Sequence, residues 1–198
     1  MFRTPIDTRT AAQSSADRFF GARAEALAFP AAMDLCRNQV PTAVSDDATR
    51  FAAEARQSTS AHAFRPDFTA ADWRVFMSFC TVRTLGADFR LVVPGRTDRT
   101  LRFVVSGSLW QVSGVSGKQA QLLMPGAIVG EDALFSDEPG ALDVRTLEDT
   151  RVIELTLPRQ KELTAACPAI AFKLLRAAGA VIAARSRASG LRAELAAN

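Results

Sequence analysis

Short apolar segments separated by glycine and proline occupy the second half of this chain and limit the folds it can adopt. In residues 101–105, Leu101, Phe103 and Val105 alternate with Arg102 and Val104, as expected of a β-strand. Further strands are expected at 89–93, 108–112, 120–124, 127–129, 144–147 and 151–157. Many short strands spaced by roughly ten residues indicate a β-sandwich or a jelly-roll barrel.

Helical patterns flank these strands. Thr69 and Asp72 form a near capping box, and Trp73 and Phe76 follow at helical spacing, which predicts a short helix before the barrel. A second helical segment is expected from Pro158. Pro168 suits the first turn of a long C-terminal helix.

The long helix carries an apolar stripe that exceeds what one barrel should need to cover. We therefore expect it to form a subunit interface, with small residues allowing close helix approach. The residues expected there are Leu174, Ala178, Val181 and Ile182. Gly190 is expected to end or weaken the helix.

The first 64 residues differ from the rest, being rich in Ala, Ser, Thr, Asp and Arg. One or two helices are expected within 16–36, and Asp46 and Asp47 are candidate caps for a helix over 48–57. We do not expect such a segment to form a hydrophobic core of its own. We expect it to pack on the barrel, bind a partner or stay partly mobile. The chain is thus divided into an extension (1–64), a barrel (65–167) and a helix (168–198).

One motif lies between the last strands. Val129-Gly130-Glu131-Asp132-Ala133-Leu134-Phe135 precedes Pro139-Gly140-Ala141-Leu142-Asp143-Val144. This motif resembles the phosphate-binding cassette of the cyclic-nucleotide-binding domain, the sensor of the bacterial catabolite-activator and Fnr regulators. Residues 103–109 and 124–131 extend the resemblance, which covers roughly 68–187. It implies a mainly β fold with flanking helices: a double-stranded β-helix (jelly-roll) barrel followed by a dimer-type helix.

The resemblance also implies a ligand site. Its family-equivalent residues are Gly130, Glu131, Asp132, Ala133, Gly140, Ala141 and Leu142. In the family, the glutamate holds the ribose 2′-hydroxyl and an arginine pairs with the cyclic phosphate. Gly140 stands at the arginine position, and Asp132 and Asp143 add negative charge. Because a buried phosphate needs a charge-assisted donor, cAMP and cGMP are disfavoured, and no cofactor is expected.

Other functional classes find little support in the sequence. His62 is the only histidine, and Cys36, Cys80 and Cys167 lack the spacing of a zinc or redox motif, so no metal site and no catalytic residues are expected. His62 is interpreted as a surface or linker residue. No apolar run approaches the roughly 18 residues of a membrane span, which makes the cytoplasm the expected location.

Two functions remain open. The first is a non-catalytic regulatory or assembly protein that acts through a protein partner or as a homodimer. The second is a small-ligand sensor that signals through the C-terminal helix to a separate partner. Direct DNA binding by the family's route is not expected, because the chain ends at Asn198, soon after that helix, and its net charge is only +3.

Overall fold

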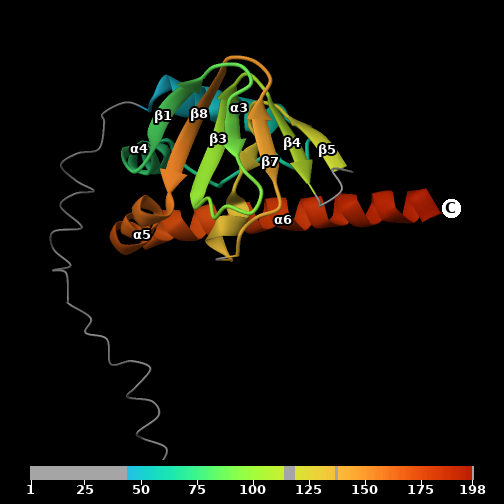
Figure 1. Cartoon of the computed structure of the whole chain (residues 1–198). Coiled ribbons are helices and arrows are strands. Elements are labelled where there is room, and N and C mark those ends of the chain that lie inside the picture. Colours follow the sequence, from blue (N-terminus) through green and yellow to red (C-terminus); the bar gives the residue numbers. More distant parts are fainter. Residues whose placement is uncertain (1–43, 114–118, 137, 198) are drawn as a thin grey trace, which may run out of the picture.

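The computed structural model describes residues 44–113, 119–136 and 138–197 (Figure 1). The helices expected within 16–36 lie outside these residues. The elements, in chain order, are α3 (Asp46–Gln57), α4 (Ala70–Ser78), β1 (Thr81–Leu85), β2 (Arg90–Val92), β3 (Thr100–Ser106), β4 (Leu109–Ser113), β5 (Gln119–Leu123), β6 (Ile128–Val129), the 3-10 helix η1 (Glu131–Leu134), β7 (Asp143–Thr146), β8 (Thr150–Thr156), α5 (Leu157–Ala166) and α6 (Pro168–Ala197).

Two antiparallel sheets form the barrel, in the orders β1-β8-β3-β6 and β2-β7-β4-β5. Strand β3 is buried on both faces. Its Phe103 belongs to an apolar cluster shared with the helices, whereas Val104 belongs to the cluster that it shares with residues of the second sheet. The described chain is therefore layered as helices, sheet and sheet, and the predicted mainly β jelly-roll with flanking helices is confirmed.

Aromatic side chains fasten the helical layer to the first sheet. The ring of Phe103 on β3 lies 5.5 Å from that of Phe51 on α3, 5.1 Å from that of Phe64 and 5.5 Å from that of Phe76 on α4. All four residues are fully buried. Part of the segment assigned to the extension thus packs on the barrel, and the apolar core continues across the boundary drawn at 64 and 65.

Several local expectations are confirmed and others need correction. The capping box of Thr69 and Asp72 is present at α4. The cap of α3 is Ser45 rather than Asp46 or Asp47. His62 is buried, not a surface residue. Strand β1 was not expected, because its sequence Thr-Val-Arg-Thr-Leu has only two apolar residues. In the structure, Leu85 is its only buried residue.

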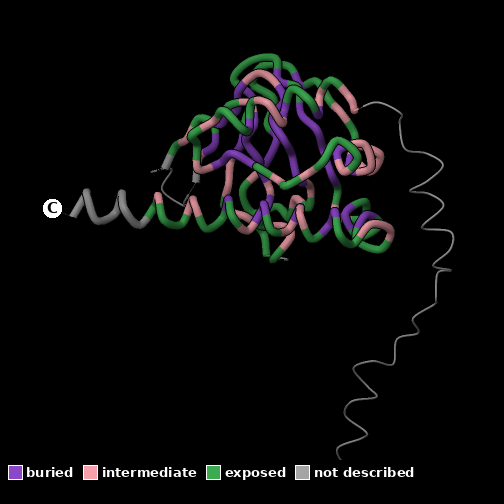
Figure 2. Tube along the Cα trace, turned by 180° about the vertical axis from the view of Figure 1, so that it is seen from behind, coloured by how far each residue is buried: buried purple, intermediate pink, exposed green. Residues whose placement is uncertain are grey.

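Helix α6 lies along one side of the barrel, and Gly190 does not end it (Figure 1). Leu174, Ala178 and Val181, which were expected at a subunit interface, are instead buried in the core that the helix shares with the barrel. Ile182 is 36% exposed. Figure 2 shows burial along the side of α6 that faces the sheets. An apolar stripe shows that a helix face is covered, but not by which surface.

Candidate functional site

The cassette turns sharply at Gly130. Its φ of 84° is left-handed, and a Cβ there would collide with the carbonyl oxygen of Thr100 on β3. Glycine is the residue that tolerates both conditions. The chain then enters η1, and this placement of the turn against β3 sets where the side chains of Glu131 and Asp132 lie.

A cavity of about 220 Å³ opens beside this turn. Five of the predicted ligand residues line it, namely Gly130, Asp132, Ala133, Gly140 and Leu142. Ala141 is exposed and does not line it. Glu131 does not line it either. Val129 and Pro139, which belong to the motif but were not among the predicted ligand residues, also line it. The rest of the wall was not expected from the sequence and comes from Val92, Arg96, Thr97, Asp98, Arg99, Arg102, Ser136 and Glu138.

Glu131 is buried against α6. Its Oε1 accepts a hydrogen bond from Nη1 of Arg185, and Nη2 of the same arginine donates to the carbonyl oxygen of Ile128 at 2.6 Å. Glu131 is 4% exposed. The carboxylate that the family resemblance assigns to a ribose hydroxyl is therefore engaged by a guanidinium from the chain's own C-terminal helix.

Burial sets the electrostatics of this pair. It raises the pKa of Glu131, an effect that the positive charge of Arg185 opposes, and it lowers the pKa of Arg185. Glu131 Oε2 and Arg185 Nε are buried without a hydrogen-bond partner. The pair is thus incompletely satisfied, but removing either partner would leave the other as an uncompensated buried charge, which costs ~3–5 kcal/mol.

Arg102 is the most deeply placed cation of the cavity wall. It is 8% exposed. Its Nε donates to Glu154 Oε1 at 3.0 Å, and its Nη1 donates to Asp98 Oδ2 at 2.6 Å. Glu154 also accepts from Arg83 at 3.3 Å. The position of Arg102 opposite Leu101 and Phe103 was evident from the alternation along β3, but the sequence did not indicate that this second face is also buried.

The acidic residues near the cassette divide into two groups. Asp132 lines the cavity, and a Cβ built on Gly140 would lie 3.6 Å from its Oδ2. Asp143 instead accepts two hydrogen bonds from Arg90, at 3.1 and 2.8 Å, and does not line the cavity. Arg145 is exposed, opposite in face to buried Val144, and lies near Asp143 rather than in the cavity. Of the two aspartates expected beside Gly140, only Asp132 therefore places its negative charge there.

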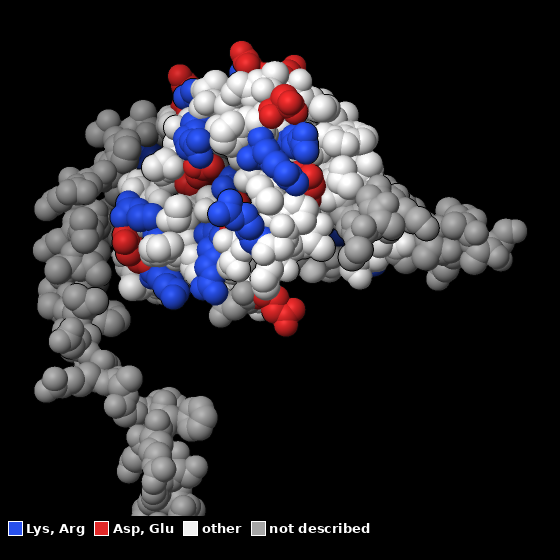
Figure 3. Space-filling model, in the orientation of Figure 1, with Lys and Arg blue, Asp and Glu red and all other residues white. Residues whose placement is uncertain are grey.

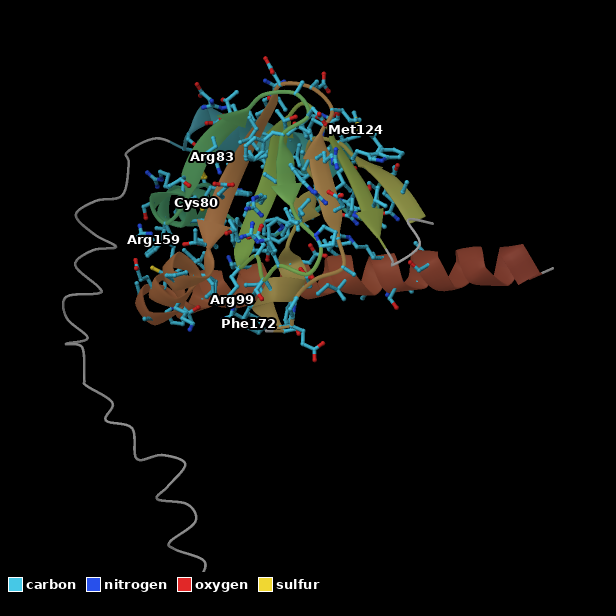
Figure 4. The ribbon with its side chains drawn as sticks, viewed as in Figure 1. Cys80, Arg83, Arg99, Met124, Arg159 and Phe172 are labelled. Atoms are coloured by element: carbon cyan, nitrogen blue, oxygen red, sulfur yellow. The ribbon has the colours of Figure 1, made fainter. Side chains whose placement is uncertain are left out.

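The cavity as a whole carries both signs of charge. Arg96, Arg99 and Arg102 come from one part of its wall, whereas Asp132 and Glu138 come from the cassette and the loop after it. Figure 3 shows basic and acidic side chains interspersed over the face that carries the sheets, and Figure 4 labels Arg83, Arg99 and Arg159 on it. No grouping of His, Cys, Asp and Glu among the described residues is suited to hold a metal ion. Nor does any helix in that part of the chain combine the length and apolarity needed to cross a bilayer.

Residues 82–166 match the family model of the cyclic nucleotide-binding domain. This match coincides with the two sheets, η1 and α5. The fold and the turn at Gly130 agree with this match, which covers 85 of the 198 residues. No curated protein matches the chain in sequence.

Solved structures share the fold at low sequence identity. A cyclic nucleotide-binding domain from Methylobacillus flagellatus KT is 19% identical, with a TM-score of 0.63 over 76% of this chain and 84% of that one. The catabolite activator protein of Thermus thermophilus is 22% identical (TM-score 0.55), covering 66% of this chain and 61% of that one. The N-terminal domain of a transcriptional regulator from Streptomyces coelicolor A3(2) is 18% identical (TM-score 0.53), covering 74% and 94%.

Proposed function

We propose that this protein is a non-catalytic regulatory or assembly module that does not bind cAMP or cGMP through its cassette and acts through protein contacts. The main observation that supports this proposal is the ion pair between Glu131 and Arg185 of α6. The residue that would hold a ribose is already engaged, so a nucleotide would have to compete with a buried ion pair inside the same chain.

The charge of the cavity supports the same proposal. Gly140 offers no side-chain donor to a cyclic phosphate, and Asp132 and Glu138 line the space. Arg102 is compensated by Asp98 and Glu154. A bound phosphate would therefore meet the carboxylates of Asp132 and Glu138 as well as the guanidinium groups of Arg96 and Arg99, and no arginine stands at position 140. Repulsion by those carboxylates would offset part of the pairing that a buried charge requires.

Calorimetric titration tests this proposal. Neither cAMP nor cGMP should give a measurable binding isotherm at micromolar concentrations. Arg185→Ala, which releases Glu131 but leaves Gly140 in place, should still fail to bind cAMP. A clear micromolar isotherm for the wild-type protein would overturn the proposal.

Protein contacts have a suitable surface on the outer side of α6. Phe172, Leu175, Gly179 and Ile182 follow one another at spacings of three, four and three, as in the seam of a coiled coil. Phe172 is 66% exposed, and a Cβ on Gly179 would meet nothing within 4 Å. Figure 4 labels Phe172 at the edge of α6 away from the sheets. We propose that this seam, rather than the buried stripe, mediates self-association.

A small-ligand sensor is the second candidate, and the open cavity favours it. A ligand with its own positive charge would suit Asp132 and Glu138, and its contact with Asp132 would lie one residue from the pair of Glu131 and Arg185. Such a sensor would signal through α6. Faster hydrogen exchange around Arg185 on addition of a candidate ligand would support it, whereas an unchanged α6 would count against it.

A further inference from the structure

A second groove, of about 290 Å³, lies between α3, α4 and the segment that joins them. Its apolar wall is formed by Val44, Ala52, Ala55, Phe64, Phe68 and Trp73. Phe64 and Ala55 are almost completely buried, whereas Val44, Ala52 and Phe68 are only partly covered by the described chain. The groove lies on the helical layer, and it shares no lining residue with the cavity beside the cassette.

We propose that residues 27–35 of the same chain occupy this groove. Val44 both lines the groove and is the first described residue, so the 43 residues that precede it are attached at the groove itself. The linker of residues 36–43 reaches at most ~30 Å when extended, which is enough to return along the groove. Attachment at this point gives the segment a high effective concentration there, which favours it over a partner in solution.

The chemistry of the segment matches the groove. Within 27–35, Leu27, Phe29, Met33 and Leu35 supply apolar side chains. Arg56 and Arg65 line the same groove and are exposed, so Asp34 brings a charge of the opposite sign. Arg65 is held in place, because its Nε donates to the carbonyl oxygen of Ala55 at 2.8 Å. An apolar segment with one acid therefore meets an apolar wall with a basic rim.

Hydrogen exchange of the full-length protein, followed peptide by peptide, tests the proposal. Amides of residues 27–35 should exchange at least about ten-fold more slowly than those of residues 1–15, because docking must open before exchange occurs. The protection should not depend on protein concentration. Fast exchange throughout 27–35 would overturn the proposal, and protection that grows with concentration would place a second copy in the groove and overturn it equally.

Two matched substitutions on α3 identify the groove as the docking site. Thr49→Trp fills the groove from an exposed position and should abolish the protection of 27–35. Arg50→Trp adds the same side chain to an exposed position that does not line the groove, and it should leave the protection intact. Equal protection in both variants would overturn the proposal.

A change in the segment itself completes the test. Phe29→Asp should speed exchange in 27–35 and around Trp73, whereas Phe2→Asp, outside the proposed segment, should change neither. No change with Phe29→Asp would overturn the docking. The outcome is separate from nucleotide binding, since neither groove nor segment includes a cassette residue.

Discussion

Gly126 has a φ of +85° and lies directly against the backbone of α3. A Cβ at this position would lie 2.5 Å from the nitrogen of Ala55 and 2.6 Å from its Cα. Gly126 also donates to the carbonyl oxygen of Val104 at 2.8 Å and accepts from the amide of Phe64 at 3.0 Å. One residue thus fixes the distance between the helical layer and β3.

We expect Gly126→Ala to be strongly destabilising. The left-handed backbone alone costs ~1–3 kcal/mol for a residue with a side chain, and the displacement of α3 adds to that cost. Gly95→Ala is the control, because Gly95 has a φ of +75° but no atom within 4 Å of an added Cβ. Urea unfolding measures both. Equal losses of unfolding free energy would show that the contact with α3 contributes nothing.

Gly140 could accept an arginine sterically, but Asp132 stands beside it. Gly140→Arg should restore only weak cAMP binding, because the new guanidinium would pair with the Asp132 carboxylate. Combining it with Asp132→Asn should raise the affinity further, by a factor of about ten if that competing pair is worth ~1.4 kcal/mol. Calorimetric titration compares the two variants. If they bind cAMP equally, Asp132 is not an obstacle.

Among the elements, β3 and α6 show how far the sequence can be read. The alternation in β3 predicted both its extent and its two faces, because strand geometry is local. That Arg102 would be buried could not be predicted, because its partners Asp98 and Glu154 come together only when β3 pairs with β8. For α6, helical spacing predicted the buried stripe but not the barrel as its partner. No feature of the sequence indicated that Arg185 of α6 would pair with Glu131.

Substitutions at two neighbouring residues of α6 can distinguish a contribution to folding stability from a contribution to self-association. Val181 is 3% exposed and Ile182 is 36% exposed. Val181→Asp should place an unpaired charge in the core and lower the free energy of unfolding by several kcal/mol, roughly the scale for such a change. Ile182→Asp should leave stability nearly unchanged but weaken self-association. Urea unfolding and light scattering provide the two readouts. A wild-type protein that is monomeric at all concentrations would rule out the proposed seam.

Across the whole described molecule, one apolar cluster links α3, α4, α5 and α6 to the first sheet. Composition and strand spacing predicted the barrel, because many short strands close only in a few ways. The joining of α3 to it was harder to predict, since 45–57 contributes mostly small and polar residues and a single aromatic, Phe51. The cassette resemblance implied a ligand site, but two of the arginines on the cavity wall, Arg96 and Arg99, come from the region between β2 and β3, where no motif marked them.

Phe51→Ala tests whether α3 and the barrel unfold together. The substitution empties a fully buried site that contacts three other aromatic rings, and we expect a loss of ~3–5 kcal/mol. The loss should appear in a single cooperative transition, followed by circular dichroism and tryptophan fluorescence in urea. A separate early transition for α3, or a loss below 1 kcal/mol, roughly the effect of a surface change, would show that the helix is a detachable addition.

The pairing of Glu131 with Arg185 has an evolutionary consequence. An arginine on α6 keeps the cassette carboxylate compensated whether or not anything occupies the cavity. Substitutions at position 140 therefore carry no folding penalty through Glu131, so this position is free to vary. Position 185 is not free to vary, because loss of the Arg185 side chain would leave the buried Glu131 carboxylate without a compensating charge. In related sequences, residues 131 and 185 should change together, while residue 140 varies independently of both.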